Sequence, residues 1–140
     1  MTGILVVAHN ALGESLVDCV RHVLGEIPPN LKVLSVYAED NPQQKLAEGQ
    51  ALIRQLDSGG GVLILADVFG ATPSNIARQL CHTEHVTGVA GVNLPMLLRV
   101  VCSPGKTLPE LAQTAIEGGR ECIVSIDSEG SDAAARCANC

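Results

Sequence analysis

The sequence predicts an α/β protein built around one open, mostly parallel β-sheet with the strand order 2-1-3-4. Two observations carry this prediction. First, the apolar runs at 4–8 and 61–66 are unbroken and rich in branched side chains, which is typical of strands buried on both faces. Second, strand-like stretches alternate with stretches whose apolar residues recur at helical spacing, which is typical of parallel strands joined by right-handed crossovers. The direction and the partner of the last strand are left open: the alternatives are an antiparallel strand and a strand exchanged with another subunit.

The first half of the chain alternates helix and strand patterns that end at turn residues. Apolar residues recur at helical spacing over 12–25, and Pro28-Pro29-Asn30 ends this first helix. A second strand is expected over 31–37. The second helix opens after an acidic loop, with Asn41 as its N-cap and Pro42 in its first position.

The middle of the chain supplies the second central strand and its crossover. Ser58-Gly59-Gly60 closes the second helix, and the strand over 61–66 follows. Thr72 is the expected N-cap of the third helix, which begins with Pro73 and runs to about Leu80. A fourth strand, weakened by two glycines, is expected over 86–92.

The last third of the chain is predicted to form two helices and a final strand. Residues 93–96 open the fourth helix, whose apolar residues continue to Val101. Thr107 is the expected N-cap of the fifth helix, which reaches Gly118-Gly119. Residues 122–126 are apolar and β-branched, and are therefore expected to form the last strand.

Length and composition indicate one domain over 1–126, followed by a tail over 127–140 that is expected to be disordered because it has no apolar period. Hydrophobic residues make up 46% of the 140 residues, yet no apolar run approaches the ~18 residues of a membrane span. A net charge of −6 and the near absence of aromatic residues argue against nucleic-acid binding. The N-terminal residues lack the basic region of a signal peptide, so a cytoplasmic location is expected.

The chain has six cysteines, and no metal or cofactor is expected. Four of them fall within predicted helices and strands and are interpreted as small core residues of a cytosolic protein: Cys19, Cys81, Cys102 and Cys122. Cys137 and Cys140 form a CxxC pair close to the C-terminus, where a scaffold for redox or metal chemistry is seldom available, so no role is assigned to them.

His9 and Asp67 end the two central strands of the predicted sheet. With the order 2-1-3-4 the first and third strands are neighbours, and ligands of open α/β sheets bind at the carboxyl edge where such strands diverge. Taken singly, His9 is more typical of a turn or surface residue and Asp67 of a turn cap. Their joint placement predicts that they meet at the strand tips as catalytic residues. The other histidines have ordinary surface positions: His22, His82 and His85.

In a histidine–aspartate pair, the carboxylate and the two ring nitrogens have different roles. The carboxylate accepts a hydrogen bond from one ring nitrogen and fixes the tautomer, so the other nitrogen keeps its lone pair. A general base would need a serine or cysteine at the strand tips, where the sequence offers only Thr72 and Ser74. A metal site would need further histidine or cysteine ligands. Nucleophilic attack by the imidazole on phosphorus is therefore the favoured chemistry.

The loop over 70–75 agrees with this chemistry. It is a turn of small residues that ends at a helix N-terminus, where free N–H groups and the helix dipole favour an anion. Thr72 either caps that helix or donates its hydroxyl to a phosphoryl oxygen. Neither GxGxxG after a strand nor a P-loop motif is present, which argues against dinucleotide and nucleotide sites. The first strand ends in a histidine and not in the acidic pair of a response-regulator receiver.

Three motifs, at 4–9, 65–75 and 91–97, together resemble the EIIA component of the mannose/fructose/sorbose family of the bacterial phosphotransferase system. The resemblance covers about residues 1–126. It implies a flavodoxin-like fold, a homodimer, and a histidine that accepts a phosphoryl group from the carrier HPr and passes it to an EIIB partner for sugar uptake.

Carried over by motif, His9 would be the phosphorylated residue and Asp67 its orienting carboxylate. The resemblance further implies phosphoryl-binding residues and a partner rim: Asn10, Ala71 and Thr72 for the phosphoryl group, and Asn93, Pro95 and Met96 for the rim. The family often has glycine where this chain has Asn10, but asparagine tolerates left-handed backbone angles. The alternative is a non-catalytic regulatory or anion-binding protein on the same fold.

Overall fold

The computed structural model describes residues 1–82, 85–127, 136–138 and 140. Strands and helices alternate from the N-terminus until two successive helices follow the last strand. The elements are β1 (Gly3–His9), α1 (Leu12–Leu24), β2 (Leu31–Val36), α2 (Pro42–Leu56), β3 (Val62–Ala66), α3 (Thr72–Leu80), β4 (Val86–Ala90), α4 (Leu94–Val101) and α5 (Leu108–Glu121). Among the described residues, no helix is long and apolar enough to cross a membrane.

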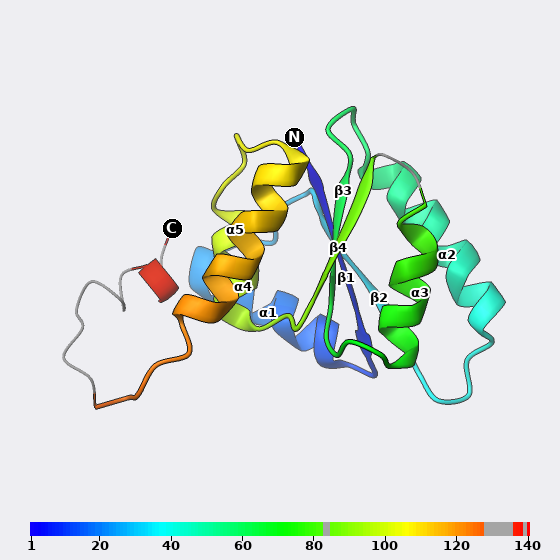
Figure 1. The fold of residues 1–140 in the computed structure, drawn as a ribbon, viewed down its shortest axis with the longest axis horizontal. Helices are drawn as coiled ribbons and strands as arrows, with labels where there is room; N and C mark the ends of the chain where they lie inside the picture. The colour runs from blue at the N-terminus through cyan, green and yellow to red at the C-terminus, as the bar shows by residue number, and fades with distance from the viewer. Residues whose placement is uncertain (83–84, 128–135, 139) are drawn as a thin grey trace.

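The four strands form one parallel sheet in the order β2-β1-β3-β4, as the sequence predicts. All four point the same way, so their carboxyl ends share the lower edge of the sheet in Figure 1. The register places Val7 beside Ala66 and His9 beside Val36. The residues that follow β1 and β3 are therefore brought together at this edge.

Helices cover both faces of the sheet, which explains the unbroken apolar character of the central strands. Helices α1, α4 and α5 lie on one face and α2 and α3 on the other (Figure 1). Alternate residues of β1 enter the two cores: Ile4 and Val6 pack toward the first set of helices, and Leu5 and Val7 toward the second. Each of these side chains is at most 1% exposed. A strand buried in this way needs no polar alternation.

The predicted N-terminal residues of the helices are confirmed, with one exception. The side chain of Asn41 accepts hydrogen bonds at the start of α2, and Thr107 is the N-cap of α5, with its N–H donating to the Glu110 carboxylate over 3.0 Å. Thr72 is the exception, because the N-cap of α3 is Ala71 and Thr72 is the first helical residue. Helical geometry starts one residue early there, so the Thr72 side chain makes no capping hydrogen bond.

The last predicted strand, 122–126, is absent. Helix α5 continues to Glu121, past the expected end at Gly119, and the residues after it have no strand structure. Ile123, Val124 and Ile126 are exposed. A strand needs a neighbouring strand to satisfy its backbone hydrogen bonds. In the single chain, residues 122–126 have no such neighbour among the described residues where they follow α5.

The expectation for most of the cysteines is also wrong. Cys102 is disulfide-bonded to Cys140, and Cys122 to Cys137. Cys19 is free but exposed, so it is not a core residue. Within the expected disordered tail, residues 136–138 have helical backbone, whereas 128–135 and 139 lie outside the described residues.

Candidate functional site

The sheet places His9 and Asp67 side by side. His9 is the last residue of β1, and Asp67 directly follows Ala66, the last residue of the adjacent strand β3. The contact that the sequence predicts is present. His9 Nδ1 lies 2.7 Å from Asp67 Oδ2, and the same oxygen accepts the backbone N–H of His9 over 2.9 Å. One carboxylate oxygen thus holds both the ring and the main chain at the end of β1.

The carboxylate of Asp67 is buried and ionised. Its side chain is only 5% exposed, whereas that of His9 is 46% exposed. Burial by itself would raise the pKa of Asp67, but hydrogen bonds from the His9 N–H, the His9 ring and the Val68 N–H outweigh it and lower the pKa below its ordinary value. An ionised carboxylate only accepts hydrogen bonds, so Nδ1 of His9 carries the proton.

The contact with Asp67 leaves the second ring nitrogen of His9, Nε2, without a bond to the carboxylate. With the proton fixed on Nδ1, Nε2 keeps its lone pair in the plane of the ring. Because nearly half of the side chain is exposed while its partner carboxylate is buried, the ring is held from one side and open to solvent on the other. The arrangement supplies an oriented, accessible nucleophile or base.

The turn after His9 depends on Asn10. This residue has φ 52°, the sole positive φ of a non-glycine residue among the described residues. Asparagine adopts this left-handed conformation more readily than most side chains. The N–H of Asn10 donates to the carbonyl of Val36 over 2.9 Å, which ties the turn to the end of β2. Asn10 thus adopts the left-handed backbone angle that the sequence analysis considered compatible with asparagine.

Ser74 braces the loop between Asp67 and α3, a role that the sequence analysis did not foresee. Its Oγ accepts the N–H of Gly70 over 2.8 Å and donates to the carbonyl of Ala71 over 3.0 Å. The side chain is buried, at 8% exposure. A serine three residues after a loop carbonyl in a glycine-containing turn is a recognisable signal for such a local bond.

Ala71 and Thr72 lie at the N-terminus of α3. Ala71 is the N-cap residue, and Thr72 is exposed in the first turn. The N–H groups in the first turn of a helix have no acceptor within the helix, so this end can receive an anion. The hydrogen bonds described for the site join Asp67 to His9 and Val68, and none joins His9 to Thr72.

The expected partner rim lies at the start of α4. Asn93 is its N-cap: Oδ1 accepts the N–H of Met96 over 2.9 Å, and Nδ2 donates to the carbonyl of Gly119 in α5 over 3.2 Å. Asn93 and Pro95 are half-buried, whereas Met96 is only 4% exposed. Asn93 thus joins α4 to α5, and the Met96 side chain lies in the core.

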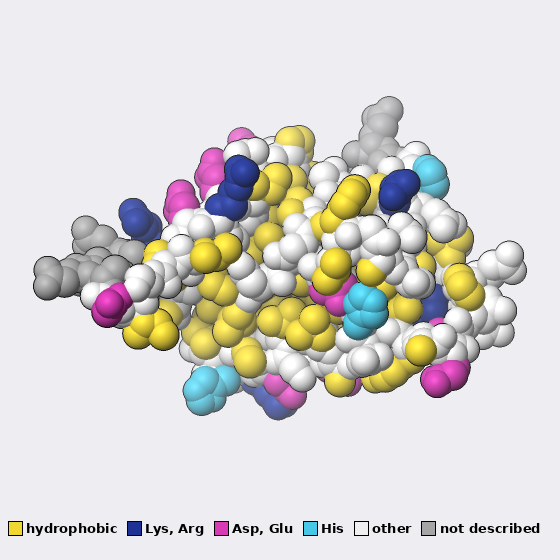
Figure 2. Space-filling view, turned by 60° about the horizontal axis from the view of Figure 1, so that its bottom comes forward, with side chains coloured by type: hydrophobic (Ala, Val, Ile, Leu, Met, Phe, Trp, Pro, Cys, Tyr) yellow, Lys and Arg dark blue, Asp and Glu magenta, His cyan; other side chains and the backbone are white. Residues whose placement is uncertain are grey.

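Exposed apolar side chains border the site, and composition alone did not reveal them. Val68 and Phe69 directly follow Asp67 and are 54% and 79% exposed, and Leu12, the first residue of α1, is 46% exposed. Figure 2 turns the carboxyl edge of the sheet toward the viewer and shows a histidine in contact with an acidic side chain, with hydrophobic side chains around them. Exposed apolar side chains beside a reactive group favour a protein partner over a small polar substrate.

Comparison with known proteins points to one family. The model of the EIIA-man family, described as the PTS system fructose IIA component, matches residues 3–115. The PTS system mannose-specific EIIAB component of Escherichia coli (strain K12) is 30% identical over 135 residues, and the match covers 94% of this chain and 42% of that protein. The chain therefore spans less than half the length of that relative.

Solved structures share the fold over nearly the whole chain. The mannose/sorbose specific IIA subunit of the phosphotransferase system from Enterococcus faecalis has a TM-score of 0.80 and 26% identity, covering 92% of this chain and 97% of that one. The phosphotransferase system component EIIA from Streptococcus agalactiae also has a TM-score of 0.80, at 22% identity, over 89% and 97% of the two chains. Because the family model covers most of its length, the chain belongs to the EIIA-man family of phosphotransferase system IIA components.

Proposed function

We propose that this protein is a phosphocarrier of the sugar phosphotransferase system, in which His9 accepts a phosphoryl group from phospho-HPr and passes it to an EIIB partner. The observation that carries the proposal is the contact between His9 Nδ1 and the buried Asp67 carboxylate. It fixes the tautomer in which Nε2 is a free nucleophile. Family membership supports the general role, because EIIA proteins are components of this system.

The transfer is an exchange of one P–N bond for another. The lone pair of His9 Nε2 attacks the phosphorus of the phosphohistidine in HPr, and the bond between phosphorus and HPr breaks as the new one forms. The Nδ1 proton stays between the ring and Asp67, whose negative charge stabilises the positive charge that the ring acquires. Transfer to EIIB repeats the exchange with the roles reversed.

Asn10, Ala71 and Thr72 are proposed to hold the phosphoryl oxygens. Supporting this, Ala71 and Thr72 begin α3, where backbone N–H groups and the helix dipole favour an anion. The Thr72 hydroxyl is exposed and is not used as a cap, so it is available as a donor. Asp67 would repel the phosphoryl group, and its burial against Nδ1 keeps it on the opposite side of the ring from Nε2.

The partners are proposed to be proteins that dock on the exposed apolar side chains beside His9, with Asn93 and Pro95 at the start of α4 forming the rim. Met96 was expected to belong to this rim, but its side chain is buried in the core and is left out of the proposal. Val68 and Phe69 offer such a contact surface at the mouth of the site. The acidic net charge favours electrostatic steering of a basic partner surface. By the same proposal the protein acts in the cytoplasm and reaches a membrane only through a permease.

A homodimer is part of the proposal. The apolar side chains of Ile123, Val124 and Ile126 are 78%, 54% and 103% exposed in the single chain, which is unusual for a stable surface. A second copy of the chain would cover them. Light scattering across a range of protein concentrations tests this, and a monomer at every concentration would contradict it.

The test of the phosphocarrier role is the intact mass after incubation with phosphoenolpyruvate, enzyme I and HPr. We expect one phosphoryl adduct that brief acid treatment removes, that the His9→Ala variant lacks and that His22→Ala retains. His22 is a suitable control because it is an exposed histidine on α1. If HPr becomes phosphorylated but this chain does not, the proposal is wrong and a regulatory or anion-binding protein is favoured.

A further inference from the structure

We propose that the C-terminal residues form a redox-controlled clasp, in which two disulfides fasten the tail to the ends of α4 and α5 and a dithiol reductant releases it. The clasp consists of Cys102, Cys122, Cys137 and Cys140. Three observations support it: the pairing of all four cysteines, their position at two helix ends, and a guanidinium group beside one of the bonds.

The pairing joins the folded domain to the tail twice. Cys102 is the C-cap residue of α4 and bonds Cys140, with the two Cα atoms 5.2 Å apart. Cys122 is the C-cap residue of α5 and bonds Cys137, with the Cα atoms 5.7 Å apart. Each disulfide therefore closes a loop between a helix end and the tail, over 38 and 15 residues respectively. The two free cysteines, Cys19 and Cys81, take no part.

The disulfides are accessible to a reductant. Cys102, Cys122 and Cys137 are half-buried and Cys140 is exposed. Disulfides are rare in reducing compartments, where those present are mostly transient or redox-sensing. We therefore expect the clasp to be open where thiols are kept reduced and closed under oxidising conditions.

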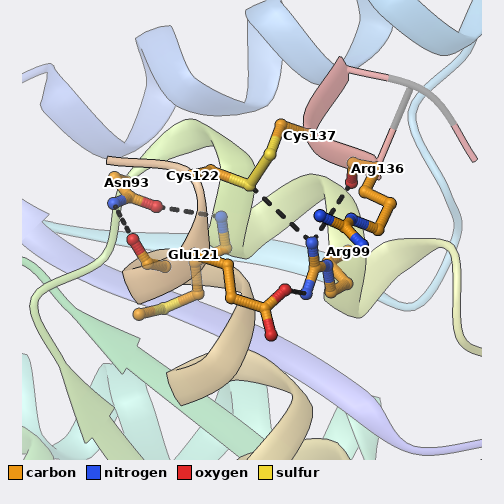
Figure 3. Close-up of a disulfide and its surroundings, with 8 residues drawn as sticks. Asn93, Arg99, Glu121, Cys122, Arg136 and Cys137 are labelled. Carbon is orange, nitrogen blue, oxygen red and sulfur yellow. Dashed lines mark hydrogen bonds and ion pairs between the residues drawn. A yellow bond between two sulfur atoms is a disulfide. The ribbon is translucent and has the colours of Figure 1, made fainter. Parts of the chain in front are cut away.

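Arg99 distinguishes the Cys122–Cys137 bond from the other disulfide. Its Nη2 lies 3.7 Å from Cys122 Sγ and donates to the carbonyl of Arg136 over 3.4 Å, and its Nη1 is paired with the Glu121 carboxylate at 2.8 Å. Figure 3 shows the guanidinium between these groups. A nearby positive charge stabilises a thiolate, so Cys122 is the better leaving group of this bond.

Opening proceeds by thiol–disulfide exchange with a dithiol. One thiolate of the reductant attacks Cys137 Sγ, the S–S bond breaks, and Cys122 leaves as a thiolate beside Arg99. The second thiol of the reductant then attacks the mixed disulfide, which frees Cys137 and leaves the reductant as its own disulfide. Two electrons and two protons pass from the reductant to Cys122 and Cys137. The Cys102–Cys140 bond, which has no such charge beside it among the described contacts, opens afterwards by the same steps.

The clasp is also linked to the start of α4. The carbonyl of Gly119, three residues before Cys122, accepts a hydrogen bond from Asn93, which caps α4. The last turn of α5 is thus held on one side by Asn93 and on the other by Arg99 and the disulfide (Figure 3). Opening of the clasp removes the disulfide and leaves the hydrogen bond from Asn93 and the ion pair between Arg99 and Glu121.

The first test counts thiols by alkylation and intact mass. Protein purified in air and denatured without reductant should take up two labels, on Cys19 and Cys81, and six after full reduction. Labelling of all six without reductant would overturn the clasp, as would copurification of Zn²⁺ bound to the four clasp cysteines as thiolates. The Cys19→Ser/Cys81→Ser variant should then show none before reduction and four after it.

The second test follows the order and rate of opening with dithiothreitol. Tryptic peptide mapping of quenched samples should show that Cys122 and Cys137 become labelled before Cys102 and Cys140. Arg99→Gln should slow the first step several-fold, whereas Glu121→Gln, which frees the guanidinium from its carboxylate, should not slow it. A purely structural role of Arg99 would make both variants open faster, and that result, or the reverse order of labelling, would overturn the assignment.

The third test measures what the clasp restrains. Limited trypsin digestion after Arg120 should be several-fold faster in reduced protein than in oxidised protein. The Cys137→Ser/Cys140→Ser variant should match reduced protein under both conditions, while Cys19→Ser/Cys81→Ser should behave like the wild type. Equal cleavage rates in the oxidised and reduced states would show that the disulfides hold nothing in place.

Discussion

Replacing Asp67 by asparagine tests the geometry of the site through stability alone. The two carboxylate oxygens divide three donors: Oδ2 accepts the backbone N–H and the ring Nδ1–H of His9, and Oδ1 accepts the N–H of Val68. An asparagine has one acceptor oxygen and one NH₂ group. Whichever way the amide is turned, its NH₂ faces a backbone N–H, of His9 or of Val68.

The expected loss follows from this mismatch. A donor that faces the buried side chain of residue 67 without finding an acceptor there costs about 1–3 kcal/mol, and the hydrogen bonds that remain lose the assistance of a charge. We therefore expect Asp67→Asn to lower the free energy of unfolding by about 1–3 kcal/mol at neutral pH. Urea unfolding followed by circular dichroism, at fixed protein concentration and with the disulfides intact, measures it.

The loss should also depend on pH. Because folding lowers the pKa of Asp67, its ionised form contributes stability that is complete above the unfolded-state value of about 3.9 and disappears as the pH falls through the lower, folded-state value. The difference between wild type and Asp67→Asn should therefore be largest at neutral pH and shrink below about pH 4. A difference that stays constant down to pH 3 would refute the reasoning.

Asp57 provides a matched control. One of its oxygens, Oδ1, accepts both the Gly59 and the Gly61 N–H groups, at 2.9 and 3.1 Å, and these bonds also lower its pKa. An asparagine keeps that single oxygen, so no donor need face another donor. Asp57→Asn should therefore cost clearly less stability than Asp67→Asn. Equal losses of unfolding free energy in Asp67→Asn and Asp57→Asn would show that the way the donors are shared between the two oxygens of Asp67 does not determine the loss.

Three further predictions concern the same edge of the sheet and the packing beneath it. His9→Ala should abolish phosphoryl acceptance in the intact-mass assay while changing the free energy of unfolding by less than about 1 kcal/mol, because nearly half of the side chain is exposed and Asp67 keeps the backbone N–H of residue 9. Asn10→Val should cost about 1–2 kcal/mol in urea unfolding, because a β-branched residue is strained at φ 52°, whereas Asn10→Gly should be tolerated. Gly13→Ala should cost about 1–3 kcal/mol, since a Cβ there would lie 2.8 Å from Val33 Cγ1, while Gly105→Ala, with open space around it, should be neutral. Equal effects in either matched pair would contradict the corresponding argument.

The sheet and the His9–Asp67 contact could be predicted because both follow from rules that act over short stretches. Unbroken apolar runs identify the strands, and the order 2-1-3-4 then makes the ends of β1 and β3 neighbours, although 58 residues separate His9 from Asp67 in the sequence. The residue types fix the rest, because a histidine and a carboxylate at adjacent strand ends have a single strong way to interact. The cap of α3 was misplaced by one residue, which is the usual precision of a helix boundary.

The C-terminal region could not be predicted, for two physical reasons. Residues 122–126 have the β-branched composition of a strand, but a strand forms only where another backbone satisfies its hydrogen bonds, and composition carries no information about that partner. The pairing of Cys102 and Cys122 with the tail depends on how α4 and α5 pack, since four cysteines allow three pairings and sequence spacing does not choose among them.

The site depends on a single carboxylate more than the sequence suggests. Asp67 Oδ2 binds the ring and the backbone N–H of the same residue, His9, so the orientation of the imidazole is coupled to the end of β1 and to the turn at Asn10. A water molecule or a side chain elsewhere could replace a bond to the ring, but neither would hold the ring and the strand end at once. This coupling predicts that Asp67→Glu, which keeps the charge but moves it by one methylene, will slow phosphoryl transfer nearly as much as Asp67→Asn. Transfer from phospho-HPr, followed by rapid quench, measures both rates, and a glutamate variant close to the wild-type rate would show that the charge of residue 67 matters and its position does not.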